Sequence, residues 1–421
     1  MLVAARDGEE RTDQQRRAKH ADDDRRGEHE PKPRAYNGIM LHALVLTMAA
    51  LVQDPAAAAL MPPIPDALAN YMPKAERHAS DHFLVVSDAP PAAIANTLNA
   101  LERTRTSLLA DLAQRGLPAT DSGVRHLAIL FSDEGAFRRF AREVDGQTLA
   151  TTLGYYQPSH RRLQLFDPES TDAVRTADAT IAKNEAAIKA RQDAVNRMRS
   201  SRLSRQEAAV AQREVDQARA KLASQRAQRE AAIDNSLKVV VVHEATHQVL
   251  FESGAQSASG LNPLWLAEGL AVAYETDDVR RPGGPTSMRD ERFATFRPAL
   301  LTNGLMPVRL LVTTRVLPSG GGTQTALQAQ ADFYAQSCMF VRWCMLERPA
   351  EFKALLAACR SAKPGDAPET IFESCFGSID AVQRSYVLWL REQIPESEHT
   401  DALRAAQSWS IDGRQAPAPT P

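Results

Sequence analysis

Cysteine is scarce in this chain of 421 residues, and no two of its four cysteines are spaced as C-x-x-C. That absence argues against a cysteine zinc site or a dithiol redox motif. Cys338 and Cys344, six residues apart on one expected helix, diverge too far to bond each other. Cys359 and Cys375 flank a loop with proline and glycine. The sequence therefore leaves open either a disulfide between Cys359 and Cys375 or four buried thiols.

Apolar runs long enough to cross a bilayer are also missing, so we expect no stable membrane span. The mostly apolar run from Ile39 to Val52 has 14 residues and fits the hydrophobic part of a signal peptide, with small residues following at Ala56 to Ala59. We expect residues 39–59 to direct export to the periplasm, cell envelope or extracellular space, starting near Met40. The charged residues 1–38 and the tail 396–421 are expected to be disordered. The alternative is a buried or membrane-associated helix in a cytosolic protein.

An excess of charge of one sign is absent as well. The chain has 50 Lys and Arg against 52 Asp and Glu, a formal net charge of -2. We therefore expect no nucleic-acid partner. A hydrophobic share of 43% suffices for a sizeable core.

Residues 171–235 contain no glycine, proline or aromatic residue and are rich in Ala, Arg, Gln, Glu and Lys, a composition that predicts helix. We predict an antiparallel coiled-coil hairpin over residues 171–236, inserted between an N-terminal α+β part (60–170) and a helical part (237–395) of one domain. It is either an arm for a protein partner or self-association, or a passive extension. Apolar residues recur there at seven-residue spacing: Val174, Ile181, Ile188 and Val195, then Val215 and Leu222.

The stretch VVVVHEATHQ (239–248) places His243 and His247 four residues apart, with Glu244 between them. On an α-helix both imidazoles leave the same face one turn apart, so they can share one metal ion. Zinc is the expected metal, because it takes imidazole nitrogen and, in catalytic sites, keeps three protein ligands and a water. Glu244 is then the general base for that water. The alternative is an amphipathic core helix with two polar histidines.

A second stretch, NPLWLAEGLAVAYE (262–275), is an apolar helix with the single carboxylate Glu268 in its interior. A glutamate is rarely buried unless it is paired or binds a metal, so Glu268 is the third candidate ligand. The small residues Ala267 and Gly269 beside it would let this helix approach the first one closely.

Together these residues resemble the gluzincin branch of zinc metallopeptidases, in which H-E-x-x-H is followed by a glutamate on the next helix. HEATHQ (243–248) and WLAEGLA (265–271) are most similar to a group of bacterial peptidase-like proteins. The resemblance implies a zincin-like domain, with His243, His247 and Glu268 as ligands and Glu244 as the base. Where many relatives carry an aspartate that holds a ligand histidine, this chain has Val272. Glu275 is either the replacement for it or only a carboxylate at the helix end.

The first part predicts a small sheet, giving an α+β fold class overall. Strands are expected at 82–88 and 125–133, with a helix at 92–114 between them and a hairpin at 155–166. Asp133 or Glu134 is expected to cap a short helix. The segment 154–166 is a candidate for the strand that binds the substrate backbone, and an ordinary core hairpin is the alternative.

In the second part, helices are expected within 300–315 and at 329–346. By the resemblance, Tyr334 lies where it could donate a hydrogen bond to the oxyanion, although tyrosine is also common in protein cores. We therefore expect a zinc peptidase acting on a peptide or protein substrate. The competing hypothesis is an exported scaffold or binding protein that keeps the fold and acts through the arm.

Overall fold

The computed structural model of the chain describes residues 62–147, 152–200, 205–275, 284, 296–297, 301, 305–316, 324–363 and 365–394. The expected signal peptide and both expected disordered ends lie outside these ranges and stay predictions. Within these ranges no helix has the length and apolar character needed to cross a membrane. The fold combines one five-stranded sheet with a larger number of helices, which confirms the predicted α+β class.

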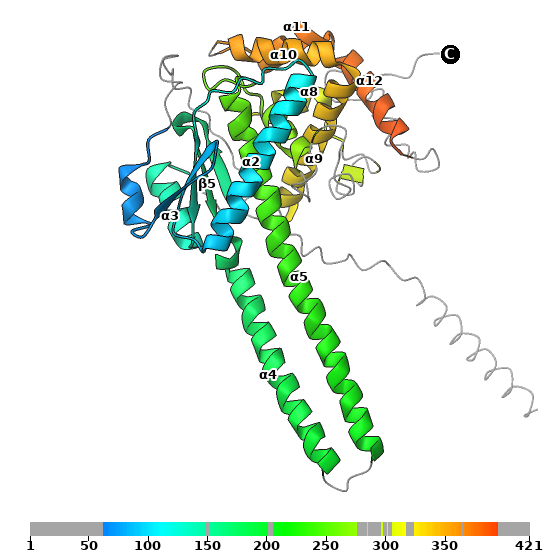
Figure 1. Ribbon diagram of the computed structural model, residues 1–421. Helices are drawn as coiled ribbons and strands as arrows, with labels where there is room; N and C mark the ends of the chain where they lie inside the picture. Colours follow the sequence, from blue (N-terminus) through cyan, green and yellow to red (C-terminus); the bar gives the residue numbers. More distant parts are fainter. Residues whose placement is uncertain are drawn as a thin grey trace, which may run out of the picture. The chain divides into compact units, whose positions relative to one another are not determined.

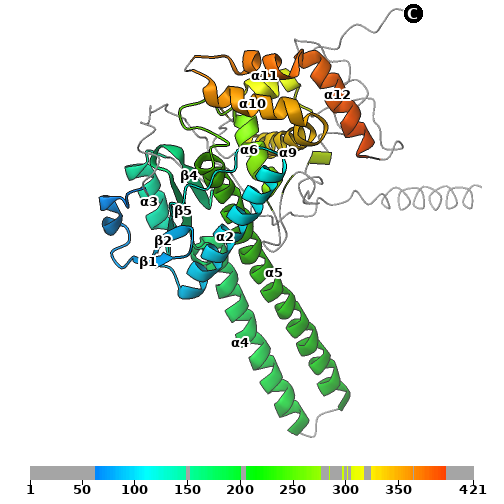
Figure 2. The ribbon, with the colours of Figure 1, turned by 45° about the horizontal axis from the view of Figure 1, so that its top comes forward.

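The sheet has the strand order β1-β2-β3-β5-β4, and Figure 2 labels β1, β2, β5 and β4 in this order. Its central strands β2 (Phe83–Ser87), β3 (His126–Phe131) and β5 (Arg162–Phe166) run parallel, while β1 (Glu76–Ala79) and β4 (Gly154–Gln157) pair antiparallel at the two edges. The sequence predicts β2, β3 and the hairpin of β4 and β5. It does not predict β1, whose residues are mostly exposed and show no apolar alternation.

Both faces of the sheet are covered, so its three central strands are buried along their whole length. Helix α3 (Glu134–Val144) covers one face, and the side chain of Asp133 caps it as predicted. The other face packs against α2 (Pro91–Gln114) and the end of α5 (Arg205–Glu252). Strand β4 shows this division: the ring of Tyr155 packs against Phe137 of α3, whereas the ring of Tyr156 packs against Phe251 of α5.

Helices α4 (Asp172–Ser200) and α5 run antiparallel and pack along each other (Figure 1). The paired helices are shown, while a supercoil between them stays a prediction. Helix α5 does not end near residue 236, where we expected the arm to end. It is one helix of 48 residues that includes the H-E-x-x-H motif. The buried residues between α4 and α5 follow the predicted spacing: Ile188, Val195, Val215 and Leu222.

The helices that follow in the chain share one hydrophobic core with α6 (Leu264–Tyr274), in which every residue is buried. The expected helices within 300–315 and at 329–346 are found as α8 and α9. In chain order the helices are α8 (Val308–Thr313), α9 (Gln324–Glu347), α10 (Pro349–Ser361), α11 (Pro368–Phe376) and α12 (Ile379–Glu392), and short 3-10 turns occur at Asp66–Asn70, Pro158–His160 and Pro168–Ser170.

Gly269 allows a close contact between α6 and α9. A Cβ atom at this position would lie 2.5 Å from the backbone oxygen of Ser337. We expected the small residues beside Glu268 to bring α6 close to α5, but the glycine instead serves the packing of α6 on α9.

All four cysteines are free thiols, so the disulfide that the sequence allowed between Cys359 and Cys375 is not formed. Cys338, Cys344 and Cys359 are buried, as the alternative predicts, whereas Cys375 is partly exposed.

Candidate metal centre

The motif residues lie near the carboxyl end of α5. The preceding run Val239 to Val242 is β-branched and has low helix propensity, yet all four valines are buried. Tertiary packing therefore keeps this segment helical. One helical turn separates His243 from His247, and their ring centroids are 5.0 Å apart.

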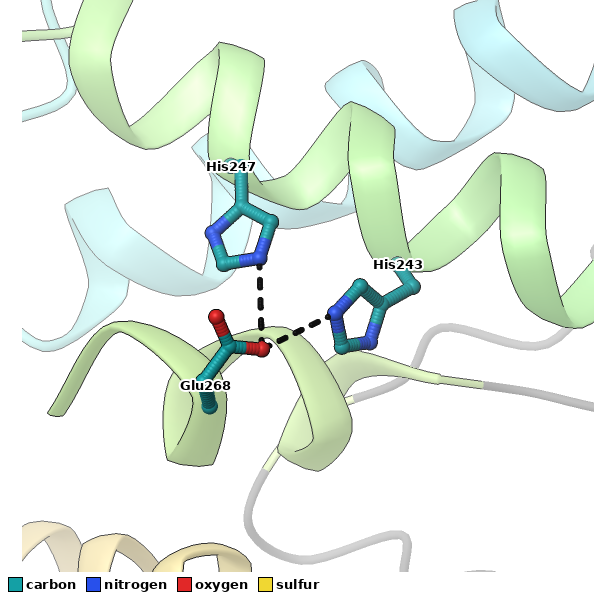
Figure 3. Close-up of side chains that lie close together, drawn as sticks. All are labelled: His243, His247 and Glu268. Carbon is teal, nitrogen blue, oxygen red and sulfur yellow. Dashed lines mark ion pairs between the residues drawn. The ribbon is translucent and has the colours of Figure 1, made fainter. Parts of the chain in front are cut away.

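Glu268 of α6 points at both imidazoles (Figure 3). Its Oε2 atom lies 3.3 Å from Nε2 of His243 and 3.7 Å from Nε2 of His247. All three side chains are buried, with exposed fractions of 1–2%. One potential ligand atom from each residue lies within 4.8 Å of the other two. The three predicted ligands thus form one buried group that can hold a metal ion.

The spacing of this group fits a tetrahedral zinc ion. With bonds of about 2.0–2.2 Å, neighbouring ligand atoms around zinc lie roughly 3.3–3.6 Å apart, close to the 3.3 and 3.7 Å found here. The 3.3 Å contact is an ion pair without hydrogen-bond geometry, so Nε2 of His243 and Oε2 of Glu268 have no hydrogen-bond partner among the described residues. Buried polar atoms need partners, and a cation would supply one to both.

Glu275, at the carboxyl end of α6, holds the other nitrogen of His243. Nδ1 of His243 lies 2.9 Å from Oε1 of Glu275, and both side chains are fully enclosed. An Nδ1–H that donates to this carboxylate leaves Nε2 free as a metal ligand and fixes the orientation of the ring. Of the two alternatives that the sequence left open for Glu275, the structure favours the histidine partner.

The pocket favours positive charge beside its carboxylates. Burial lowers the pKa of His243, but the contacts with Glu268 and Glu275 outweigh it and raise this pKa to about 10. Burial raises the pKa of Glu268, but the neighbouring His247 and His243 outweigh it and lower this pKa to about 2. A carboxylate that stays ionised in a buried pocket is what a cation site requires.

Glu244 lies on the side of α5 that faces β4 and is 4% exposed. The backbone N–H of Tyr156 donates a hydrogen bond to its Oε2 at 2.9 Å, while burial raises the pKa of its carboxyl above the ordinary value. Strand β4 can lie this close because of Gly154, where a Cβ would be 3.1 Å from Cγ1 of Val240. Sequence reasoning missed the contact, since a backbone donor has no residue signature.

Tyr334, the predicted oxyanion donor, is 3% exposed on α9 and packs edge-on against Phe333. It is not part of the three-residue group described above. Its helix packs on α6 through Ser337, one turn further along. The predicted role of Tyr334 therefore stays a prediction.

Comparison with known proteins gives one match. Residues 238–366 match the model of a family described as "Protein of unknown function (DUF1570)". This segment contains the three candidate ligands, Glu244, Glu275 and Tyr334, but not the sheet or α4. Neither a curated protein nor a solved structure matches the chain.

Proposed function

We propose that the chain is a zinc-dependent peptidase that hydrolyses peptide bonds by the gluzincin mechanism on a zincin-like domain. His243, His247 and Glu268 hold the ion, Glu244 is the general base and acid, and Tyr334 donates a hydrogen bond to the oxyanion. One observation carries the proposal: two imidazoles and a carboxylate converge in a buried group, with a second carboxylate beside them that is not a ligand. A structural metal site needs no such base.

A zinc ion held by the three ligands would lower the pKa of a water to about 7 and polarise the substrate carbonyl. Glu244 accepts a proton from the attacking water while the bond from oxygen to the carbonyl carbon forms. The Tyr156 N–H keeps this carboxylate in place. When the C–N bond breaks, Glu244 passes the proton to the leaving amine, so one water molecule is divided between the two products.

Strand β4 is suited to bind the substrate backbone, because it forms an edge of the sheet. The N–H of Tyr156 faces Glu244 and not β5, and in an extended strand the carbonyl of the same residue faces the same side. A peptide could add there as a further strand beside the base. Strand β5 is paired on both sides and cannot accept a further strand. Within the segment 154–166, the proposed substrate-binding strand is therefore β4.

The test is metal analysis of the purified chain together with a chelator-sensitive assay on a mixed peptide library. We expect one zinc per chain and peptide cleavage that a chelator abolishes and added zinc restores. A chain that contains zinc but cleaves no peptide would point instead to a scaffold or to hydrolysis of another kind of amide.

The alternative is an exported scaffold that keeps this fold and acts through its arm. The observation that favours it is the exposure of the arm. Helix α4 and the first half of α5 share only a small apolar cluster, so most of their side chains face outward, where a partner could bind. Deleting residues 171–235 separates the two proposals. A peptidase should keep its activity, whereas a scaffold should lose its partner.

A further inference from the structure

A cavity of about 580 Å³ lies at the carboxyl end of α5, beside the turn between β4 and β5. Its volume falls within the roughly 300–1,000 Å³ of small-molecule sites. Its walls come from four separate stretches of chain: residues 120–122, 156–161 and 251–259, and Arg360 of α10. None of the three metal-ligand candidates lines it. Tyr156 belongs to both places, because its backbone N–H donates to Glu244 and the residue also lines the cavity.

Two polar side chains in these walls are buried without a partner among the described residues. Tyr156 is 1% exposed and Gln256 is 3% exposed. Neither the phenol oxygen of Tyr156 nor the amide nitrogen and oxygen of Gln256 form a hydrogen bond within the described chain. Buried polar groups are nearly always hydrogen-bonded, and both residues with unpartnered groups belong to the cavity walls.

Three of the four carbonyl groups that the end of α5 leaves open are already occupied. The backbone oxygens of Val249, Leu250 and Phe251 each accept from an N–H of residues 253–256. The oxygens of Ser253 and Gly254 are also used, because the N–H of Thr120 donates to Ser253 and the guanidinium of Arg360 donates to Gly254. The backbone oxygens of five residues at this helix end are therefore not available to a ligand.

The charged residues of the walls are Arg161, Arg360 and Glu252. Arg161 and Glu252 pair with each other through two hydrogen bonds. Asp121, between two wall residues, pairs with Arg105. In the described part of the chain, the structure shows no carboxylate within ion-pair distance of Arg360. The walls thus carry one positive charge that is not compensated.

We infer that this cavity binds a ligand through a single carboxylate, with Arg360 as its cationic partner and Tyr156 and Gln256 as further donors. A guanidinium pairs with a carboxylate through two parallel hydrogen bonds. The amide oxygen of Gln256 adds an acceptor for an N–H next to that carboxylate. The carboxylate belongs either to an acidic side chain of a peptide or to a small free acid. The inference does not depend on the proposed peptidase activity, because binding is its readout.

The test is calorimetric titration of the full chain, carrying Glu244→Gln so that turnover does not contribute heat. The probes are two matched pairs: Ac-Ala-Glu-Ala-NH2 with Ac-Ala-Gln-Ala-NH2, and succinate with succinamide. We expect one of the two acids to bind and its neutral analogue to bind at least about tenfold more weakly. Binding of the peptide identifies an acidic side chain as the source, and binding of succinate identifies a free acid.

Arg360→Gln should weaken the binding of that acid by about tenfold or more. Lys353→Gln removes the same charge from an exposed site on the same helix and should not affect binding. Should Arg360→Gln fail to fold, Ser259→Trp decides, since this exposed wall residue can carry a side chain that fills the cavity. The inference is overturned if no acid binds, if the neutral analogues bind equally well, if a folded Arg360→Gln leaves binding unchanged, or if Ser259→Trp does.

Discussion

The two halves of α5 differ in how many of their residues are buried. Between residues 206 and 233 the buried positions recur every seven residues, at Ala208, Val215 and Leu222, against the single partner α4. Between residues 239 and 250 every residue is buried, among sheet, α2 and α6. A periodic apolar pattern marks a helix with one covered face, and it disappears where a helix is surrounded. The candidate ligands His243 and His247 lie in the half without a pattern.

Two carboxylates on α5 give the largest expected contrast. Glu244→Gln removes the proposed base and should lower kcat by about 10²–10⁴-fold while zinc is retained. Glu230→Gln, on the exposed surface of the first half, should leave kcat unchanged. Peptide assays with metal analysis of both variants measure this contrast. Equal activity of the two variants would mean that Glu244 is not the base.

Acid should destabilise the part of the fold that contains the sheet and surrounds the second half of α5. His126 begins β3, whose next residue Leu127 accepts a hydrogen bond from Gln248 of α5. Burial lowers the pKa of His126 from 6.5 to about 4. Because the unfolded chain binds this proton more readily, the stabilisation is complete above pH 6.5. It is lost as the pH falls towards 4, at a cost on the order of 3 kcal/mol.

Urea unfolding at pH 7 and pH 4.5 measures this effect, and His126→Gln should remove most of the difference. A His126→Gln chain that is as sensitive to acid as the natural one would place the cause elsewhere.

Glu275, the hydrogen-bond partner of His243, should affect metal affinity. Glu275→Gln should weaken zinc binding by about 10–100-fold, because the donor and acceptor roles of the ring nitrogens are no longer fixed by a carboxylate. Competition with a chromophoric chelator measures the affinity. Activity should return at high zinc concentration, which separates this variant from Glu244→Gln. Unchanged affinity would show that another group orients the imidazole.

Two buried valines on α5 give the smallest and best matched comparison. Val241 is 0% exposed in the core with the sheet, and Val215 is 1% exposed in the small cluster with α4. Val241→Ala should lower the free energy of unfolding by about 2 kcal/mol. Val215→Ala should cost less than about 1 kcal/mol, since a thin cluster can collapse around the gap. Chemical denaturation measures both. Equal decreases in the free energy of unfolding would mean that the arm is packed as firmly as the core beside the sheet.

The sequence predicts features that depend on neighbouring residues. The short apolar runs of β2 and β3, the spacing of α2 and the two imidazoles on one helical turn all follow from local patterns. The single carboxylate in an apolar helix, Glu268, predicted the third member of the group because burial of an unpaired charge is costly.

Contacts between distant segments have no such local pattern in the sequence, so they could not be predicted from it. The N–H of Tyr156 that holds Glu244 is a backbone group and has no residue identity. Glu275 was left undecided, because its reach to His243 depends on how α6 crosses α5. The walls of the cavity beside Arg360 come from four stretches that only the folded chain brings together.

The unbroken course of α5 has a mechanical consequence. Its 48 residues span about 70 Å, and its path from the free end of the arm to His247 contains neither proline nor glycine that would act as a joint. The arm and the segment that carries His243 and His247 are therefore parts of one continuous helix. A partner that bent the arm would load the same helix that carries both imidazoles.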